Sequence, residues 1–364
     1  MDHERFMRMA LRLARRGGAS PNPMVGAVIV KDGEVVGRGF HPKAGESHAE
    51  VFALLDAREA ARGATLYVNL EPCSHYGRTP PCADAVIAAG IVRVVAAMQD
   101  PDPRVSGNGF RKLREAGIDV MVGVLERQAA EMNEAYLKHI ATGMPFVTLK
   151  MAMTLDGKIA SHQGDSRWIS GEQSRCVVHK LRARVDAVLI GAGAAIQDDP
   201  LLTARHGTVA KQPARVVVDE VAALSLDSRI LQEPGGEVIV ATTCRADPAK
   251  IGKLEAAGAR ILILDEVGGL VDLPALFREL DNMGIINILA EGGGELSASL
   301  VNARLVDKVL MFIAPKIIGG RAAKTPVEGE GTALMSEALP LTDIRVSRCG
   351  EDLVVTGRPD YGDG

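Results

Sequence analysis

The first 140 residues alternate between amphipathic and continuously apolar segments. Residues 2–16 repeat apolar side chains at helical spacing with arginines between them, which predicts an amphipathic helix. An apolar run at 24–30 ends in the hairpin turn signal Lys31-Asp32-Gly33, and a second strand is expected at 35–37. The same patterns predict further strands at 64–70, 92–97 and 119–124, and helices at 82–89, 110–116 and 126–140.

One more helix is expected over residues 48–61. Ser47 is a residue type that caps helices, and it would place His48 and Glu50 in the first turn, while Gly63 would end the segment. Helices and strands therefore alternate through this half of the chain, which is typical of an α/β fold.

A second series of elements begins after Gly143-Met144-Pro145, where we expect the domain boundary, giving domains at 1–144 and 145–364. Apolar strand-like runs separated by amphipathic helices predict an α/β domain with a largely parallel sheet. The expected strands are 146–151, 185–191, 214–219, 237–242, 260–264, 286–290 and 305–314, and the expected helices are 172–183, 249–257, 273–283 and 296–302.

The composition is that of a globular enzyme and argues against two classes of partner. The 364 residues are 47% hydrophobic and 24% charged, with a formal net charge of −4. This balance carries no basic footprint for nucleic acid, and no apolar run reaches the ~18 residues that a transmembrane helix needs. Five scattered cysteines and the lack of an apolar export signal lead us to expect a reducing, cytoplasmic setting.

The chemistry of the first half centres on His48, Glu50, Cys73 and Cys82. One imidazole and two thiolates suit Zn²⁺ and leave the fourth tetrahedral position open for water. Glu50 is then free to carry protons between that water and a leaving amine, as in the H-x-E…P-C…C signature of zinc deaminases. That signature has two residues between the cysteines, whereas residues 74–81 separate them here.

Two plainer interpretations of these residues stay open. The cysteines are short apolar side chains and can simply fill a core. Alternatively, His75 can complete a four-ligand structural zinc site, in which Glu50 would have no role.

A second candidate site lies around Glu291-Gly292-Gly293-Gly294, between a predicted strand and a predicted helix. Glycines let the backbone approach a phosphate, and the helix N-terminus favours its charge. Arg182, Arg205 and Lys150 add cations, so we expect two phosphate-bearing ligands, a dinucleotide and a phosphorylated substrate. A plain strand-to-helix turn and ordinary surface arginines remain the alternatives.

A set of short motifs runs through both halves of the chain. They are Pro21-Asn22-Pro23-Met24-Val25-Gly26, Gly39-Phe40-His41, Gly45 to Glu50, Glu71 to Cys82, Leu155-Asp156-Gly157-Lys158, Trp168-Ile169-Ser170, Asp198 to Thr203, Arg205 and Glu291-Gly292-Gly293. Through these motifs, over nearly its whole length, the chain resembles the bifunctional riboflavin-biosynthesis deaminase/reductases. The resemblance extends to the eight-residue cysteine spacing, which is that family's own.

The resemblance implies a cytidine-deaminase-like α/β/α domain followed by a dihydrofolate-reductase-like α/β domain. It implies two consecutive reactions: deamination of 2,5-diamino-6-ribosylamino-4(3H)-pyrimidinone 5′-phosphate, then reduction of its ribosyl group to ribityl by NADPH. The expected product is 5-amino-6-ribitylaminouracil 5′-phosphate. We also expect a homo-oligomer, whose size the sequence does not fix.

The resemblance further implies roles by position. In the first domain His48, Cys73 and Cys82 would bind zinc, Glu50 would shuttle protons, and Asn22, His41, His75 and Asp100 would hold the substrate. In the second domain Ser166, Arg182, Leu202, Arg205 and Glu291 would face the substrate. Ala152, Trp168, Asp198 and the turn Gly293, Gly294, Glu295, Leu296, Ser297, Ala298 and Ser299 would face NADPH. The family usually has Thr at the position of Ala194, so one cofactor hydrogen bond would be missing.

Two other functions remain open from the sequence alone. The chain could deaminate another substrate, such as a nucleoside or tRNA, with a second half used only for binding. It could also be a non-enzymatic module in which the zinc site is structural.

Overall fold

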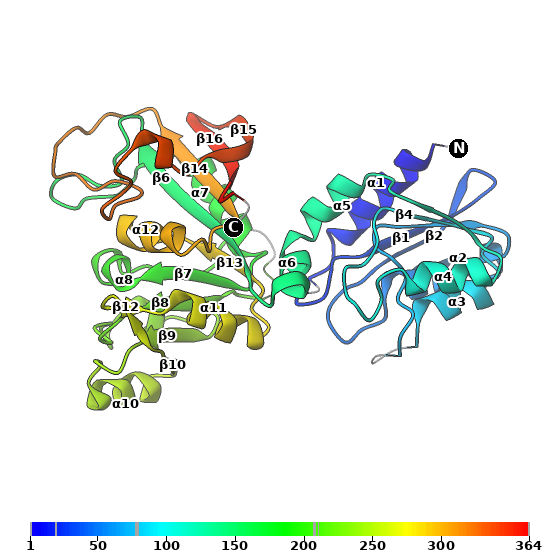
Figure 1. Ribbon diagram of the computed structural model, residues 1–364, viewed down its shortest axis with the longest axis horizontal. Coiled ribbons are helices and arrows are strands. Elements are labelled where there is room, and N and C mark those ends of the chain that lie inside the picture. Colours follow the sequence, from blue (N-terminus) through cyan, green and yellow to red (C-terminus); the bar gives the residue numbers. More distant parts are fainter. Residues whose placement is uncertain (1, 19, 77–79, 207–208, 210, 363–364) are drawn as a thin grey trace. The chain divides into compact units, whose positions relative to one another are not determined.

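The computed structural model describes residues 2–18, 20–76, 80–206, 209 and 211–362, and the chain divides into two units, Met1–Gly143 and Met144–Gly364. The Gly77-Arg78-Thr79 part of the cysteine motif lies outside the described residues. Figure 1 shows the course of the chain. None of the helices in the described ranges is long and apolar enough to cross a membrane.

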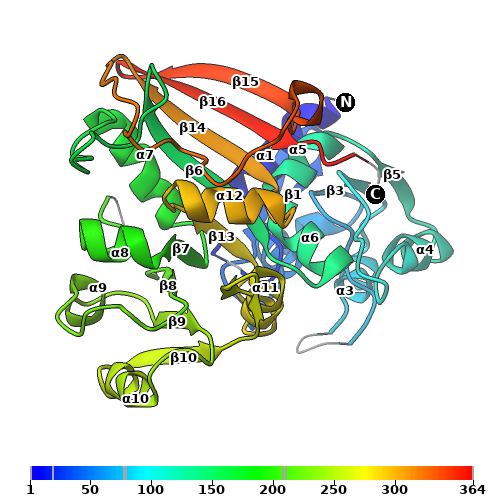
Figure 2. The ribbon, with the colours of Figure 1, turned by 60° about the vertical axis from the view of Figure 1, so that its left-hand side comes forward.

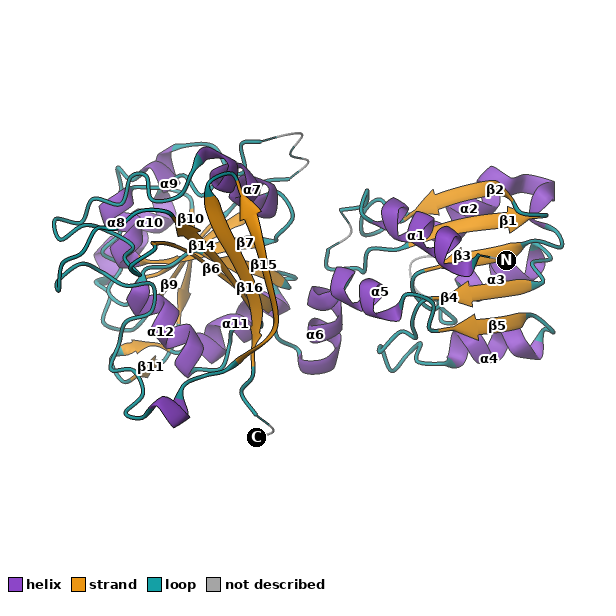
Figure 3. Cartoon of the chain, turned by 90° about the horizontal axis from the view of Figure 1, so that it is seen from above, coloured by secondary structure: helices purple, strands orange, loops and turns teal. Residues whose placement is uncertain are grey.

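The first unit is a five-stranded sheet in the order β2-β1-β3-β4-β5, visible side by side in Figure 3. The hairpin strands pair antiparallel with each other, β1 pairs antiparallel with β3, and the last three strands run parallel. Its strands are β1 Gly26–Lys31, β2 Glu34–Phe40, β3 Thr65–Val68, β4 Arg93–Ala96 and β5 Asp119–Val122; its helices are α1 His3–Ala14, α2 Ala49–Ala57, η1 Arg58–Ala61, α3 Cys82–Ala88, α4 Asn108–Glu115, α5 Glu126–Met132 and α6 Glu134–Thr142.

Glycines let two helices pack directly on this sheet. A Cβ at Gly26 would lie 2.1 Å from the carbonyl oxygen of Ala10 in α1, and a Cβ at Gly39 would lie 2.1 Å from that of Ala49 in α2. Gly26 is paired with Phe40 and Gly39 with Ala27, so the two glycines face opposite sides of the pleated sheet. The helix that carries Glu50 is thereby held against the backbone of β2.

Two predictions for this unit are wrong. Ser47 does not cap α2: the N-cap position belongs to His48. The helix predicted over 126–140 is two helices, because the chain breaks at Asn133. The Asn133 amide is bonded to Met24 instead, accepting from its N–H at 2.8 Å and donating to its carbonyl oxygen at 3.1 Å.

The second unit is built on a nine-stranded sheet in the order β10-β9-β8-β7-β13-β6-β14-β16-β15. The seven strands from β10 to β14 run parallel, as predicted, and β16 and β15 add an antiparallel edge that Figure 2 shows beside β14. The strands are β6 Phe146–Thr154, β7 Ala187–Gly191, β8 Ala214–Val218, β9 Val238–Thr242, β10 Ala259–Ile263, β13 Asn287–Ala290, β14 Lys308–Ala314, β15 Leu341–Cys349 and β16 Asp352–Pro359, with a separate small pair, β11 Glu266–Val267 and β12 Leu270–Val271.

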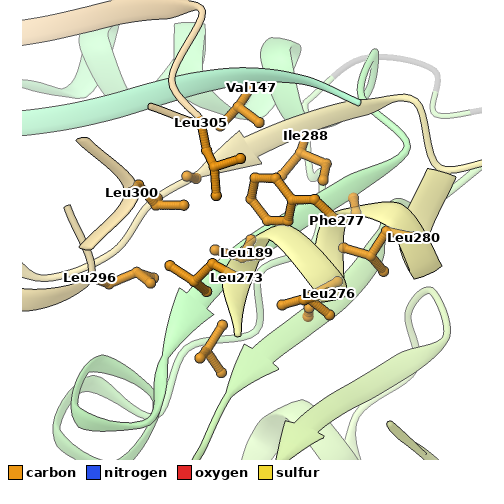
Figure 4. Packing of buried hydrophobic residues seen from close by; sticks show 14 of the residues in the cluster. Val147, Leu189, Leu273, Leu276, Phe277, Leu280, Ile288, Leu296, Leu300 and Leu305 are labelled. Atoms are coloured by element: carbon orange, nitrogen blue, oxygen red, sulfur yellow. The ribbon is translucent and has the colours of Figure 1, made fainter. Parts of the chain in front are cut away.

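Helices cover both faces of this sheet. On one face Phe277 and its neighbours on α11, with Leu296 and Leu300 of α12, pack on strand residues such as Leu189 and Ile288 (Figure 4). On the other face, α10 packs beside the outer strands and α7 beside β14 and β16. The helices are α7 Glu172–Arg182, α8 Ala192–Asp198, α9 Arg229–Gln232, α10 Pro248–Ala256, α11 Leu273–Asn282, α12 Gly294–Asn302 and η2 Met335–Glu337.

Several elements of this unit were not predicted. The β15–β16 hairpin was missed because β15 is exposed along almost its whole length and so carries no buried apolar pattern. The helix α8 was missed because only Ala195 within it is buried. Asp198 is the last residue of this helix.

Candidate functional site

The first unit brings the three predicted metal ligands together at the ends of its elements. His48 is the N-cap of α2, Cys82 is the first residue of α3, and Cys73 lies between β3 and α3. Their ligand atoms all lie within 4.8 Å of one another, and among the described residues no other group of three His, Cys, Asp or Glu side chains converges in this way. The Nδ1 atom of His48 is 3.2 Å from the Cys82 sulfur and 3.6 Å from the Cys73 sulfur.

The contact between the two cysteine sulfurs favours a thiolate at Cys73 and a protonated thiol at Cys82. The contact with Cys82 lowers the pKa of Cys73 to about 4, and the same contact together with burial raises the pKa of Cys82. The backbone N–H of Cys82, at the start of α3, also donates to the Cys73 sulfur at 3.3 Å. Thiolate and imidazole donors at this spacing fit a divalent zinc ion.

Glu50 lies beside the cluster but is not one of its three converging ligands. It is 3% exposed, and its Oε2 atom has no hydrogen-bond partner within the described part of the chain. Burial raises the pKa of Glu50 to about 7. A buried carboxylate oxygen without a hydrogen bond destabilises the folded state unless a ligand or a water molecule donates to it.

Asn22 and His41, two of the four further substrate candidates of this unit, contact each other. His41 is 2% exposed and its ring lies edge-on to His48, with centroids 5.3 Å apart. Its Nδ1 atom donates to the Ser47 carbonyl oxygen at 3.1 Å, so Nε2 is the acceptor that faces the Asn22 amide at 3.1 Å. Burial lowers the pKa of His41, which keeps the ring in this neutral form.

His75 and Asp100 are the other two candidates. The Nδ1 atom of His75 is buried without a partner among the described residues, so it is free to meet a ligand. Asp100 accepts from the Tyr136 hydroxyl at 2.9 Å and from the Asp102 N–H at 3.0 Å. Burial raises the pKa of Asp100. The sequence analysis did not single out Tyr136, which was only one position of the helix predicted over 126–140.

In the second unit two of the predicted substrate residues, Arg182 and Glu291, contact each other. The Arg182 guanidinium donates two hydrogen bonds to the Glu291 carboxylate, from Nε at 2.6 Å and from Nη2 at 3.0 Å. Lys150 lies 3.6 Å from the same carboxylate. Burial alone would raise the pKa of Glu291, but Arg182 and Lys150 outweigh it and lower it to about 2.

The other predicted substrate residues, Ser166, Arg205 and Leu202, have different partners. The Ser166 hydroxyl donates to Asp198 at 3.2 Å, so a predicted substrate residue and a predicted cofactor residue touch. Arg205 donates to the Thr203 hydroxyl at 3.3 Å and to His179 Nε2 at 3.2 Å. Leu202 is 2% exposed and its side chain belongs to the core, so only its backbone is available to a ligand.

The glycine-rich turn forms the N-terminus of α12. Gly293 is its N-cap, no side chain caps it within the described structure, and a Cβ there would meet nothing within 4 Å. The open space beside Gly293 suits a phosphate of a dinucleotide, whereas Gly294 is buried and a Cβ on it would lie 2.5 Å from the Glu328 side chain. The side chains of Leu296, Ser297 and Ala298 point into the core, and Ser297 donates back to the Gly293 carbonyl oxygen at 3.1 Å. In this turn the backbone and the more exposed Glu295 and Ser299 are what a cofactor could reach.

Trp168 and Ala152 complete the predicted cofactor residues. Trp168 is 63% exposed, and the Arg175 guanidinium lies 4.7 Å from its ring centroid. Lys316 donates to the carbonyl oxygens of Trp168 and Ile169, at 2.6 and 2.9 Å. Ala152 is half-buried on β6 and pairs with Phe312. Ala194 lies within α8, the helix that Asp198 ends.

A His–Cys–Cys cluster beside a buried glutamate, on one unit, defines a zinc-deaminase type of site, and the second unit presents a parallel α/β sheet with a cationic, glycine-lined site. Comparison with known proteins agrees on both halves. Residues 1–98 match the cytidine and deoxycytidylate deaminase zinc-binding region, and residues 145–355 match the RibD C-terminal domain.

The similarity to individual proteins spans the whole chain. It is 44% identical over 352 residues to the riboflavin biosynthesis protein RibD of Aquifex aeolicus, covering 96% of each, and 44% identical over 336 residues to that of Escherichia coli, covering 88% of this chain and 90% of the other. A solved structure of Acinetobacter baumannii RibD superposes with a TM-score of 0.88 at 39% identity, covering 99% of both chains.

The chain belongs to the RibD family. It is a deaminase and reductase of riboflavin biosynthesis, with a zinc-binding deaminase domain and a reductase domain of the kind that uses NADPH. The two-domain fold expected from the sequence is thereby confirmed.

Proposed function

We propose that the two units catalyse consecutive steps on one phosphorylated pyrimidine. The first removes an amino group from 2,5-diamino-6-ribosylamino-4(3H)-pyrimidinone 5′-phosphate, and the second reduces the ribosyl group of the product with NADPH. The observation that carries the first step is the buried, unpartnered Oε2 of Glu50 beside three converging zinc donors. The solved Thermotoga maritima protein, named as the corresponding deaminase/reductase, is 37% identical over 98% of both chains with a TM-score of 0.86.

In the deaminase we assign zinc to His48, Cys73 and Cys82. The bound ion supplies Lewis acidity that makes water a nucleophile near neutral pH. Glu50 is placed to accept the water proton at Oε2 and to return it to the departing amine. A carboxylate whose pKa lies near 7 can do both at neutral pH, because neither protonation state is strongly disfavoured.

The residues around the cluster would orient the pyrimidine. Asn22 is held by the neutral His41 ring, which fixes the amide so that its oxygen is available to a ring N–H. His75 offers a buried nitrogen without a partner in the described chain, and Asp100 a carboxyl group fixed by Tyr136. We assign these four residues to substrate binding.

In the reductase we assign Arg182, Glu291, Arg205, Ser166 and the Leu202 backbone to the substrate. Glu291 is ionised because two cations face it, and it presents a fixed charge where the sugar would be opened. Arg205 is a cation with no acidic partner among the described residues, which suits the substrate phosphate. Lys150, 3.6 Å from the Glu291 carboxylate, is our candidate for the proton donor in the reduction.

NADPH would lie beside the proposed substrate site. Its bound nicotinamide supplies the hydride, which is the cofactor's own chemistry. We assign Gly293 and the backbone of the α12 turn to its phosphates, and Ala152, Trp168 and Asp198 to the rest of the molecule. The contact between Ser166 and Asp198 would set the distance between donor and acceptor.

We also propose that the protein is a cytoplasmic homo-oligomer. The five cysteines are free of disulfides. A reducing compartment would keep Cys73 and Cys82 available as thiolate ligands for zinc. β15 is an edge strand with Ile344 50% and Val346 64% exposed, which is a surface that a second copy could cover.

The test is turnover of the Glu50→Gln variant. Without NADPH, the wild-type protein should release ammonia from the diaminopyrimidine ribotide, and on adding NADPH the product mass should rise by two hydrogens. The variant should lose at least about 100-fold in deamination while still reducing supplied aminouracil ribotide. Unchanged deamination by the variant would remove Glu50 from the mechanism.

A further inference from the structure

We propose that His179 is a positioning residue of the reductase, holding the Arg205 side chain in the orientation that receives the substrate phosphate. The inference rests on the proposed function, because it takes Arg205 as a substrate ligand. Nothing in the sequence patterns singled out His179, which lies one turn before Arg182 on α7.

The hydrogen bonds of His179 admit a single arrangement of its protons. The residue is 8% exposed, and its Nδ1 atom lies 3.1 Å from the Thr203 carbonyl oxygen. A carbonyl oxygen only accepts, so Nδ1 carries the proton. In the neutral ring Nε2 is then an acceptor, and the Arg205 Nη2 group, which only donates, lies 3.2 Å from it.

Arg205 depends on this contact more than a paired arginine would. Its other hydrogen bond goes to the Thr203 hydroxyl at 3.3 Å, and it has no ion pair within the described residues. Arg182 is engaged by Glu291 and cannot substitute for it. Burial lowers the pKa of Arg205, and Arg182 and Arg229 lower it further, so the site holds uncompensated positive charge that an anion would stabilise.

The groups that face His179 keep it neutral. Arg182 lies on the same helix, and Arg205 and His206 lie on the segment after α8; His206 is 5.1 Å away by ring centroids and is in contact with Cys176. Burial, then Arg182 and Arg205, lower the pKa of His179 to about 4. Protonation would set an N–H against the Arg205 N–H, so the hydrogen bond between the two residues is present at neutral pH and is lost as the pH falls through about 4.

Two near-isosteric variants separate positioning from packing. In His179→Gln the side-chain oxygen can reach the place of Nε2 and accept from Arg205. In His179→Asn the shorter amide can keep the bond to the Thr203 carbonyl but leaves nothing for Arg205 to donate to. Both place an uncharged polar group in the buried site, and the smaller Asn leaves part of the imidazole volume unfilled.

The experiment measures reductase KM for the aminouracil ribotide at saturating NADPH and near-neutral pH. We expect His179→Asn to raise KM about 10-fold with kcat changed by less than about 3-fold, and His179→Gln to stay within about 3-fold of wild type. With the dephosphorylated substrate, all three proteins should have the same KM. The unchanged reductase kcat controls for folding of the second unit, and equal deaminase activity of the same preparations controls for the first.

The outcomes separate this inference from the assignment on which it rests. If Arg205→Gln leaves KM for the ribotide unchanged, the assignment of Arg205 to the phosphate is wrong. If Arg205→Gln raises KM but His179→Asn does not, only the positioning role is wrong. Equal losses in the Asn and Gln variants, or a loss that persists with the dephosphorylated substrate, would also overturn it, because they indicate general packing.

Discussion

Arg182 and Glu291, 109 residues apart in the sequence, form a two-pronged ion pair with side chains only 12% and 7% exposed. The pair joins the C-terminal end of α7 to the segment that follows β13. Both charges are buried, so removing either side chain leaves the other as an uncompensated buried charge. The pair therefore supports the fold of the reductase unit as well as its proposed substrate site.

Replacing Glu291 by Gln should destabilise the second unit by about 3 kcal/mol, because Arg182 and Lys150 would keep their charges without a carboxylate. Urea unfolding followed by fluorescence measures this directly, since the single tryptophan, Trp168, lies in that unit. The matched control is Glu295→Gln, an exposed glutamate four residues further on, which should stay within about 0.5 kcal/mol of wild type. Equal effects of the two substitutions would contradict the role of the pair.

The same carboxylate makes the stability of the second unit fall in acid. The pKa of Glu291 is lowered from 4.5 to about 2, so the folded state resists protonation. Its contribution is complete above pH 4.5 and is lost as the pH falls from 4.5 toward 2. Unfolding curves of wild type and Glu291→Gln should therefore converge over this window. A constant difference between them down to pH 2 would show that the pKa is not lowered.

Replacing Cys82 by Ser should remove zinc, because a neutral hydroxyl is a much poorer ligand than a thiolate. Elemental analysis should find about one zinc ion per chain in wild type and far less in the variant. Deamination should be lost, while reduction of supplied aminouracil ribotide continues. Cys244→Ser is the control, since Cys244 is exposed in the other unit. Full zinc content in Cys82→Ser would mean that another residue supplies the ligand.

Replacing Trp168 by Ala should raise the KM for NADPH about 10-fold, because an exposed aromatic face is lost from the proposed cofactor site. Initial rates at 340 nm with varied NADPH measure this, and deamination should not change. Met335→Ala is the comparison, since Met335 is 89% exposed in the same unit and has no assigned role. An unaltered KM in Trp168→Ala would place the cofactor elsewhere.

The sequence determined the local features of both sites. His48, Glu50 and Cys82 were assigned to helix starts from capping and periodicity, and each lies at or within the first turn of its helix, although the cap proved to be His48 and not Ser47. The parallel strands of the second unit were found because strands buried on both faces read as continuous apolar runs. Asn133 broke a predicted helix because its amide is bonded to Met24, a partner that lies outside the local pattern.

Only the tertiary structure decided which charges meet. Nothing local to Arg182 marks it as the partner of Glu291, or Arg205 as the arginine that His179 holds, because those contacts join segments that the sheet brings together. The tertiary structure also decided which side chains are buried. Burial raised the pKa of Glu50, and Leu296 and Ser297 point into the core. Residue types and spacing fix which chemistry a chain can perform, whereas desolvation and long-range pairing, which require the packed fold, set the charge state of each group.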